Sequence, residues 1–231
     1  MILHACARVS FYCILLHFHV VVGIDNMLAR YIRKSFEDQL GKKTASQIEQ
    51  ELDSWYHIDL DGAIQQFEKL DRVLVNMYGK GPARSLERRF LKPIIKTNNL
   101  TNGDGDALGN NVAITITEPQ LVQTVLTIVE DASFREIFEV MDRDKSFESI
   151  LKDADLEIAR PSAYRKMEHL AKNGLIMETG YVMGRGSRKV KTYKKIFDAI
   201  DIQMDGGAIS IVMTVNKNVL ETSVILGIIL S

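Results

Sequence analysis

Positively charged side chains are concentrated in one part of the chain, where they could bind a polyanion. Residues 158–195 contain ten Lys and Arg residues but only two acidic ones, a net charge of +8. Residues 117–157 contain four basic and eleven acidic residues, a net charge of −7, while the whole chain has a formal net charge of only −1. A nucleic acid would therefore meet the basic part, and the acidic part would face away from it.

The basic region begins in a predicted helix at residues 161–173. Pro161 suits the first turn, where a missing N–H costs nothing, and Asn173 with Gly174 tolerates a left-handed C-cap. The apolar positions fall at i, i+4 and i+7 and form one stripe: Ala163, Met167 and Leu170. The polar face carries Ser162, Arg165, Lys166, His169 and Lys172. The pattern predicts a helix that buries one side and turns its cations outward.

Elements on both sides of this helix complete a recognisable order. Residues 147–154 are predicted to form a helix, and residues 155–159 a turn. Strands are expected at residues 177–181 and 190–196, joined by a Gly-Arg-Gly-Ser-Arg-Lys tip at residues 184–189. Two helices followed by a basic glycine hairpin are typical of a winged helix, which places one helix in the major groove of DNA.

Residues 146–195 resemble the ArsR-like or MarR-like winged helix-turn-helix of prokaryotic, including archaeal, transcription regulators. The resemblance is carried by Ser146-Phe-Glu-Ser-Ile-Leu151, Arg160-Pro-Ser-Ala-Tyr-Arg-Lys-Met167, Asn173-Gly-Leu-Ile176 and the tip at Gly184–Lys189. It implies a recognition helix at residues 161–173 and a basic wing at residues 184–191 on the DNA backbone. The candidate DNA-binding residues are Arg160, Ser162, Tyr164, Arg165, Lys166, His169, Arg185, Arg188, Lys189 and Lys191.

The resemblance implies a specific chemistry for some of these residues. Arg165 could make a bidentate contact to guanine, whereas Ser162 and Tyr164 are expected to contact phosphates and fix the register. The expected partner is double-stranded DNA, bound by a homodimer in the cytoplasm. The alternative is a protein-interaction adaptor, which would carry an exposed apolar or acidic docking face instead of a basic one.

The region before the basic part is expected to be a helical output or sensor domain at residues 27–97. Apolar stripes predict four helices, the first ending near Gly41, the third with Asp61 as its N-cap, and the fourth opening at Pro82. Tyr31–Gly41 and Phe67–Asp71 resemble the output domains found beside such modules in ammonia-oxidising archaea. This domain could receive a ligand or a protein partner.

The remaining boundaries complete a predicted α+β fold, in which an N-terminal helical bundle precedes a winged helix-turn-helix domain at residues 112–231. Residues 98–111 have the composition of a linker. A strand is expected at residues 112–117, and helices at residues 119–130 and 134–141. Asp205-Gly-Gly predicts a hairpin that extends the wing into a larger antiparallel sheet. The apolar segment 219–230 could be a helix or a strand.

Residues 1–26 differ from the rest because residues 9–24 are almost continuously apolar. Three explanations remain open: a misplaced start with Met27 opening the functional protein, a membrane anchor, or a signal peptide. We expect a membrane partner only if this segment is an anchor. We expect the chain to fold without residues 1–26.

No motif for catalysis, a cofactor or a metal is present. The sequence lacks a nucleophile elbow, a P-loop and a helix-borne His/Glu pair. The two cysteines, Cys6 and Cys13, do not form a zinc-site pattern, and an EF-hand-like start at Asn102 lacks the required glycine and glutamate. We therefore expect a non-enzymatic protein without cofactor or metal.

Overall fold

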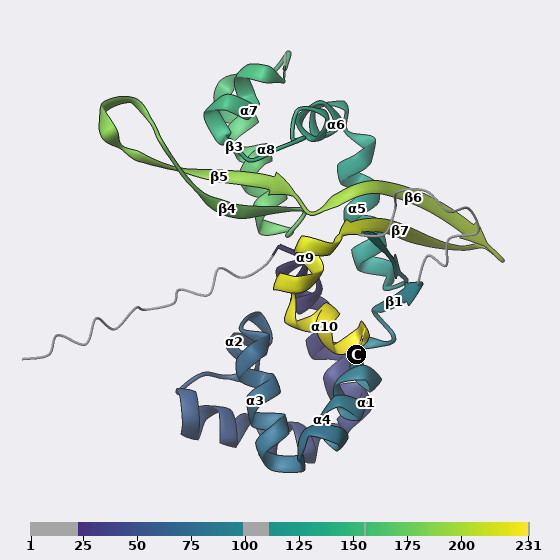
Figure 1. The fold of residues 1–231 in the computed structure, drawn as a ribbon. Helices are drawn as coiled ribbons and strands as arrows, with labels where there is room; N and C mark the ends of the chain where they lie inside the picture. The colour runs from purple at the N-terminus through teal and green to yellow at the C-terminus, as the bar shows by residue number, and fades with distance from the viewer. Residues whose placement is uncertain (1–22, 99–110, 155, 231) are drawn as a thin grey trace, which may run out of the picture.

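The computed structural model describes residues 23–98, 111–154 and 156–230 and has an α+β architecture (Figure 1). One end of the molecule is a bundle of the N-terminal helices, drawn in purple and blue. The helices of residues 132–172 form the other end, and two antiparallel sheets lie between the two helical groups. The predicted α+β class is confirmed. Most of the apolar segment at residues 1–26 lies outside the described residues.

Helix α1 (Gly23–Tyr56) runs through the whole bundle and is kinked at Gly41. Gly41 has φ 74° and ψ 155°, which a residue with a side chain adopts only at a cost, so the predicted stop at this glycine corresponds to the kink. The helix begins before Met27, and both Ile24 and Asp25 are buried. The predicted boundary after residue 26 therefore cuts through the first turns of α1.

Three more helices complete the N-terminal part of the bundle: α2 (Leu60–Gln65), α3 (Phe67–Tyr78) and α4 (Lys80–Leu91). The expected third helix is broken at Gln66, and its N-cap is Asp59, which accepts a hydrogen bond from the Gly62 amide at 2.7 Å. The prediction of Asp61 as the cap was wrong. The rings of Phe36 and Phe90 meet edge to face at 5.1 Å in the centre of the bundle.

The larger sheet has four antiparallel strands in the order β1-β2-β7-β6. They are β1 (Ile95–Asn98), β2 (Asn111–Ile116), β6 (Phe197–Asp205) and β7 (Ala208–Asn216). The predicted linker at residues 98–111 joins β1 to β2, which pair with each other, and residues 99–110 lie outside the described residues. Gly206 and Gly207 both have positive φ, as the predicted two-residue hairpin turn requires.

The smaller sheet has the order β3-β5-β4, and its β4–β5 hairpin spans the residues at which the sequence predicts a wing. Its strands are β3 (Lys145–Ser146), β4 (Ile176–Met183) and β5 (Lys189–Lys195), with the short turn η1 (Arg185–Ser187) at the tip. The expectation of a single enlarged sheet was wrong. Only Ile196 separates β5 from β6, but its buried side chain and its amide bond to the Leu175 carbonyl, 3.1 Å long, mark the point where the chain leaves one sheet for the other.

Four helices cover these sheets: α5 (Pro119–Glu130), α6 (Ala132–Glu139), α7 (Phe147–Asp153) and α8 (Arg160–Lys172). The first turns of α5, α6 and α7 are capped by acidic or hydroxyl side chains, as where Ser146 accepts from the Ser149 amide at 3.2 Å. Ile137, Ile150 and Met167 are fully buried between the helices and the sheets. The predicted helical segments of this region are therefore all found, with ends shifted by one or two residues.

The chain ends in two short helices, α9 (Lys217–Thr222) and α10 (Val224–Leu230), so the apolar C-terminal segment is helical. Helix α10 returns to the N-terminal bundle and lies beside α1 and α4 (Figure 1). A division of the chain after residue 111 therefore does not separate two independent cores. Within the described ranges, no helix is both long and apolar enough to cross a membrane.

Candidate nucleic-acid interface

Helix α8 has the two faces that its sequence predicts. Ala163, Met167 and Leu170 are buried against the sheet and the neighbouring helices. The exposed positions are Arg160, Pro161, Ser162, Arg165, Glu168, His169 and Lys172. Arg165 is exposed and, among the residues that the structure describes, has no acidic partner, so its guanidinium is available to a ligand. Glu168 lies one helical turn after Arg165, and its carboxylate would repel a phosphate placed beside it.

Lys166 does not point outward as predicted. Its ammonium group pairs with the carboxylate of Asp131 and lies 4.2 Å from the centre of the Phe134 ring, so that only 21% of the side chain is exposed. The ion pair holds the pKa of Asp131 below its usual value. Because both contacts come from α6 and its N-cap, Lys166 fastens α8 to α6, and its role as a DNA contact is not supported by this position.

His169 lies beside the same aromatic ring. The imidazole and the Phe134 ring are 5.8 Å apart, and partial burial together with the nearby cations Arg30, Lys166 and Lys172 lowers the histidine pKa. The side chain is therefore neutral at pH 7. It could offer a hydrogen bond to a base or phosphate, but it does not add a positive charge.

Arg160 and Tyr164 lie on the side of α8 that faces α7. The Arg160 guanidinium pairs with Glu148 at 3.3 Å and lies 5.9 Å from the Tyr164 ring. Both members of the ion pair are mostly exposed, so water screens it and a phosphate could replace the carboxylate at little cost. Tyr164 is half-buried, and its ring lies 6.4 Å from that of Phe147.

The β4–β5 hairpin, at which the sequence predicts the wing, has a tightly closed tip. The Gly184 amide donates to the Arg188 carbonyl at 2.8 Å, and Gly186 and Ser187 both have positive φ. Arg188 and Lys189 are exposed beyond this turn, and the Arg185 side chain lies outside what the structure describes. Lys191 pairs with Glu178 at 2.7 Å, and this pair raises the lysine pKa.

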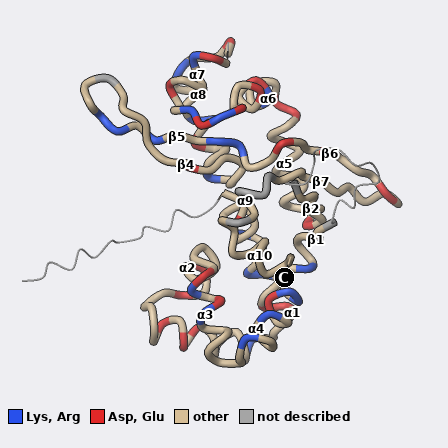
Figure 2. Tube along the Cα trace, in the orientation of Figure 1, with Lys and Arg blue, Asp and Glu red and all other residues tan. Residues whose placement is uncertain are grey.

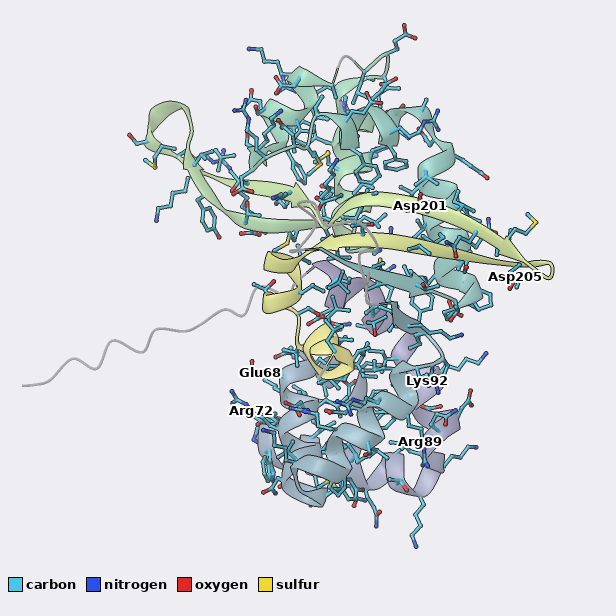
Figure 3. The ribbon with its side chains drawn as sticks, turned by 45° about the vertical axis from the view of Figure 1, so that its right-hand side comes forward. Glu68, Arg72, Arg89, Lys92, Asp201 and Asp205 are labelled. Carbon is cyan, nitrogen blue, oxygen red and sulfur yellow. The ribbon has the colours of Figure 1, made fainter. Side chains whose placement is uncertain are left out.

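The charges of the two hairpins are opposite. Lys and Arg residues mark β5 and the wing, whereas Asp201 and Asp205 lie along the β6–β7 hairpin, which extends to the other side of the molecule (Figures 1, 2 and 3). Between Phe197 and Val215 the chain has three aspartates and no basic residue. A polyanion is therefore attracted to the wing and repelled from the other hairpin.

No protein-family model, curated protein or solved structure matches this chain. The resemblance to winged regulators rests on the motif residues themselves.

A contact that the sequence did not reveal fixes the C-terminal end of α8. The Leu175 amide bonds to the Leu170 carbonyl and the Gly174 amide to the Ala171 carbonyl, which is the Schellman arrangement. Arg30 of α1 reaches the same end, donating to the Lys172 carbonyl at 3.0 Å and to the Asn173 side chain at 3.1 Å. No local pattern could have indicated this contact, because Arg30 lies more than 140 residues earlier in the chain.

Two surface grooves are further candidate binding sites. A groove of about 400 Å³ between α7 and α8 has an apolar floor of Leu151, Leu156 and Ile158 with charged residues at its rim. A second groove of about 650 Å³ lies between α4 and α10, and its lining includes Lys80, Arg84 and Ile228. In the parts of the chain that the structure describes, no three His, Cys, Asp or Glu side chains are grouped as a metal site requires.

Proposed function

We propose that this protein is a DNA-binding transcription regulator that works through a winged helix-turn-helix at residues 145–195. The observation that carries the proposal is the joint placement of exposed cations on α8 and on the β4–β5 tip. The element order β3, α7, α8, β4, β5 with an antiparallel sheet supports it. The basic charge of this region, opposite to that of the β6–β7 hairpin, supports it further. We place the protein in the cytoplasm, with the DNA.

In this proposal α8 enters the major groove with its N-terminal half. Arg165 reads a guanine edge through its two parallel N–H donors. Ser162, Arg160 and the hydroxyl of Tyr164 bind phosphates and fix the register. Arg188 and Lys189 bind the backbone from the wing, where each neutralised phosphate releases counterions and makes binding dependent on salt. Lys166 acts indirectly, by holding α8 on α6.

We further propose that two copies bind together through the β6–β7 hairpin. Ile202, Met204 and Ile209 are exposed and lie on one face, because Met204 pairs with Ile209 and Ile202 with Ile211. Asp201 and Asp205 lie on the opposite face of β6. Two apolar faces can therefore meet without bringing the carboxylates together. Light scattering of Met204→Ser, with Gln203→Ser on the opposite face as control, tests this dimer; an unchanged mass would contradict it.

A protein-interaction adaptor is the second candidate, and one observation favours it. Tyr181, Val182 and Met183 are three consecutive exposed apolar residues on β4. An adaptor would use such residues to dock a protein. The helical bundle could then be a receiver for a ligand or a further partner, for example at the groove between α4 and α10.

Binding to DNA distinguishes the two candidates. Fluorescence anisotropy with selected and random duplexes across a salt series should give a linear fall of log affinity with log salt. Arg165→Ala should weaken selected duplexes by about 1–3 kcal/mol and relax the preference at one base position. Arg89→Ala, which removes an exposed arginine on α4, is the matched control. Binding without a salt slope, or an Arg165→Ala protein that binds like wild type, would favour the adaptor.

A further inference from the structure

The wing carries an apolar surface that phosphate binding does not explain. The side chains of Tyr181 and Met183 are 59% and 66% exposed, and Val182 between them is 46% exposed. Large apolar side chains in water cost free energy, so a run of three on one strand suggests a ligand that covers them.

The strand register divides this surface into two faces. Tyr181 is opposite Lys191 and Met183 is opposite Lys189, so these four side chains share one face of the hairpin. Val182 is opposite Val190 on the other face. We call the first group the wing face: Tyr181, Met183, Lys189 and Lys191. It combines an apolar centre with the ammonium groups of Lys189 and Lys191, the second of which pairs with Glu178 at 2.7 Å.

The wing face is turned to the same side as the helices. Tyr193 follows Lys189 and Lys191 at the same alternation on β5, and its ring contacts that of Phe147 in α7 at 4.1 Å. A duplex lying against α8 would therefore meet the wing face rather than the Val182 face. A bulge between Glu178 and Gly180 bends the ribbon just before this surface begins.

We infer that the wing is a DNA-bending arm, which lays the wing face in a minor groove and inserts the Met183 side chain between two base pairs. This inference rests on the proposed DNA-binding function. Apolar wedges of this kind partly unstack a base step and kink the duplex, and nearby lysines are attracted by the negative potential of a narrow groove. The tip is slender enough to follow a groove because Gly184, Gly186 and Ser187 carry little bulk.

The alternative occupant of a cationic and apolar surface is an anionic lipid layer. A flat layer would also approach α7, which belongs to the segment of residues 117–157 with its eleven carboxylates and only four basic residues. These carboxylates would be repelled by lipid phosphates over a broad contact. A groove of DNA is narrow and can receive the ribbon alone, so the charges favour DNA.

The experiment measures the shape of the bound duplex with the full-length chain. A selected 30-bp duplex, roughly three helical turns, carries a fluorophore pair at its ends and 2-aminopurine at single positions. Wild-type protein should raise the energy transfer between the ends, as expected for a bend of roughly 20–90°, and raise 2-aminopurine fluorescence at one step. Met183→Ser should abolish both signals. Its affinity should change less than about tenfold, because the cost of unstacking offsets the binding energy that the bent duplex adds.

Val182→Ser is the matched control, since it removes an exposed apolar side chain from the opposite face of the same strand and should bend DNA like wild type. A straight duplex in the wild-type complex, or a Met183→Ser complex bent like wild type, would overturn the inference while leaving the DNA-binding proposal intact. Failure to bind any duplex would overturn the proposed function itself. Binding to vesicles of phosphatidylserine instead, lost in Met183→Ser, would assign the wing face to lipid.

Discussion

The side chains of Asp25 and Ser223 are hydrogen-bonded to each other, although 198 positions separate them in the chain. The second carboxylate oxygen of Asp25 accepts from the Val224 amide at 3.1 Å, and the Ser223 hydroxyl accepts from the Leu226 amide at 3.0 Å. Two free N–H groups in the first turn of α10 are thereby satisfied, one of them by a carboxylate from α1. The contact fastens the last helix to the first.

The Asp25–Ser223 contact predicts a coupled loss of stability. Asp25→Ala and Ser223→Ala should each lower the free energy of unfolding by about 1–2 kcal/mol, because each leaves at least one buried amide of α10 without a partner. The double variant should be less destabilised than the two single losses added together. The difference should be at least about 0.5 kcal/mol, because the hydrogen bond between the two side chains can be lost only once. Urea titrations measure this cycle. Ser162→Ala, on the exposed face of α8, should leave stability unchanged, and strict additivity would show that the two residues act separately.

Because the carboxyl group of Glu87 is buried, we expect the free energy of unfolding to rise as the pH falls below 7. Its side chain is fully buried in α4, one oxygen accepts from Arg84 at 2.6 Å, and the other has no partner among the described residues. Burial raises the pKa of this carboxyl from 4.5 to about 7. The folded protein therefore keeps a proton that the unfolded chain releases, and the benefit grows as the pH falls from 7 toward 4.5.

Between pH 8 and 5.5 this group alone should add about 2 kcal/mol to the free energy of unfolding. Burial also raises the pKa of Asp25 to about 6, so Glu87→Gln should flatten the profile but leave a smaller rise, about 1 kcal/mol. The lowered pKa of His169 acts in the opposite direction in both proteins and cancels in their difference. Equal slopes for wild type and Glu87→Gln in urea titrations would contradict the assignment.

The parts of the fold that the sequence predicts well are those with local causes. Pro161 and Asn173-Gly174 bracket α8, and Asp205-Gly206-Gly207 dictates a hairpin, so both lie within a few residues of their predicted positions. The break at Gln66 has no such marker. The division into two sheets, the return of α10 to the bundle and the Arg30 contact at the end of α8 depend on packing between distant segments. Periodicity cannot reveal these contacts, because it reports which face is buried and not against what.

In the candidate interface, too, periodicity did not reveal the partner of a side chain, because Lys166 pairs with Asp131. The structure therefore predicts different effects for changes at the neighbouring residues Arg165 and Lys166. Lys166→Met should lower the free energy of unfolding by roughly 1 kcal/mol, because it removes the ion pair with Asp131 and the contact of the cation with Phe134. Arg165→Ala should leave stability within about 0.5 kcal/mol, since Arg165 is exposed. The affinity for selected DNA should show the reverse order, because Arg165→Ala should weaken binding more than Lys166→Met does. Fluorescence anisotropy measures both affinities. If the two changes weaken DNA binding equally, Lys166 contacts DNA after all.

Gly174 provides a test of how closely α1 is seated against the end of α8. Its φ is +70°, and a Cβ atom there would lie 2.0 Å from the Gly23 carbonyl oxygen and 2.6 Å from the Met27 amide nitrogen. Both neighbours are backbone atoms of α1, so no side chain can move aside. Gly174→Ala should therefore destabilise the protein by more than the roughly 1 kcal/mol that a left-handed alanine costs by itself.

Gly186→Ala is the matched control for this change, because Gly186 has nearly the same φ, +69°, with a left-handed ψ of 32° and nothing within 4 Å of the added Cβ. It should show the conformational cost alone. Gly174→Ala should exceed it by about 2 kcal/mol or more, since relief of the overlap requires α1 to move and breaks the bonds from Arg30 to Lys172 and Asn173. Urea titrations give both costs, and hydrogen exchange at residues 24–30 should rise only in Gly174→Ala. Equal losses in the two variants would mean that α1 can leave the end of α8 at no cost.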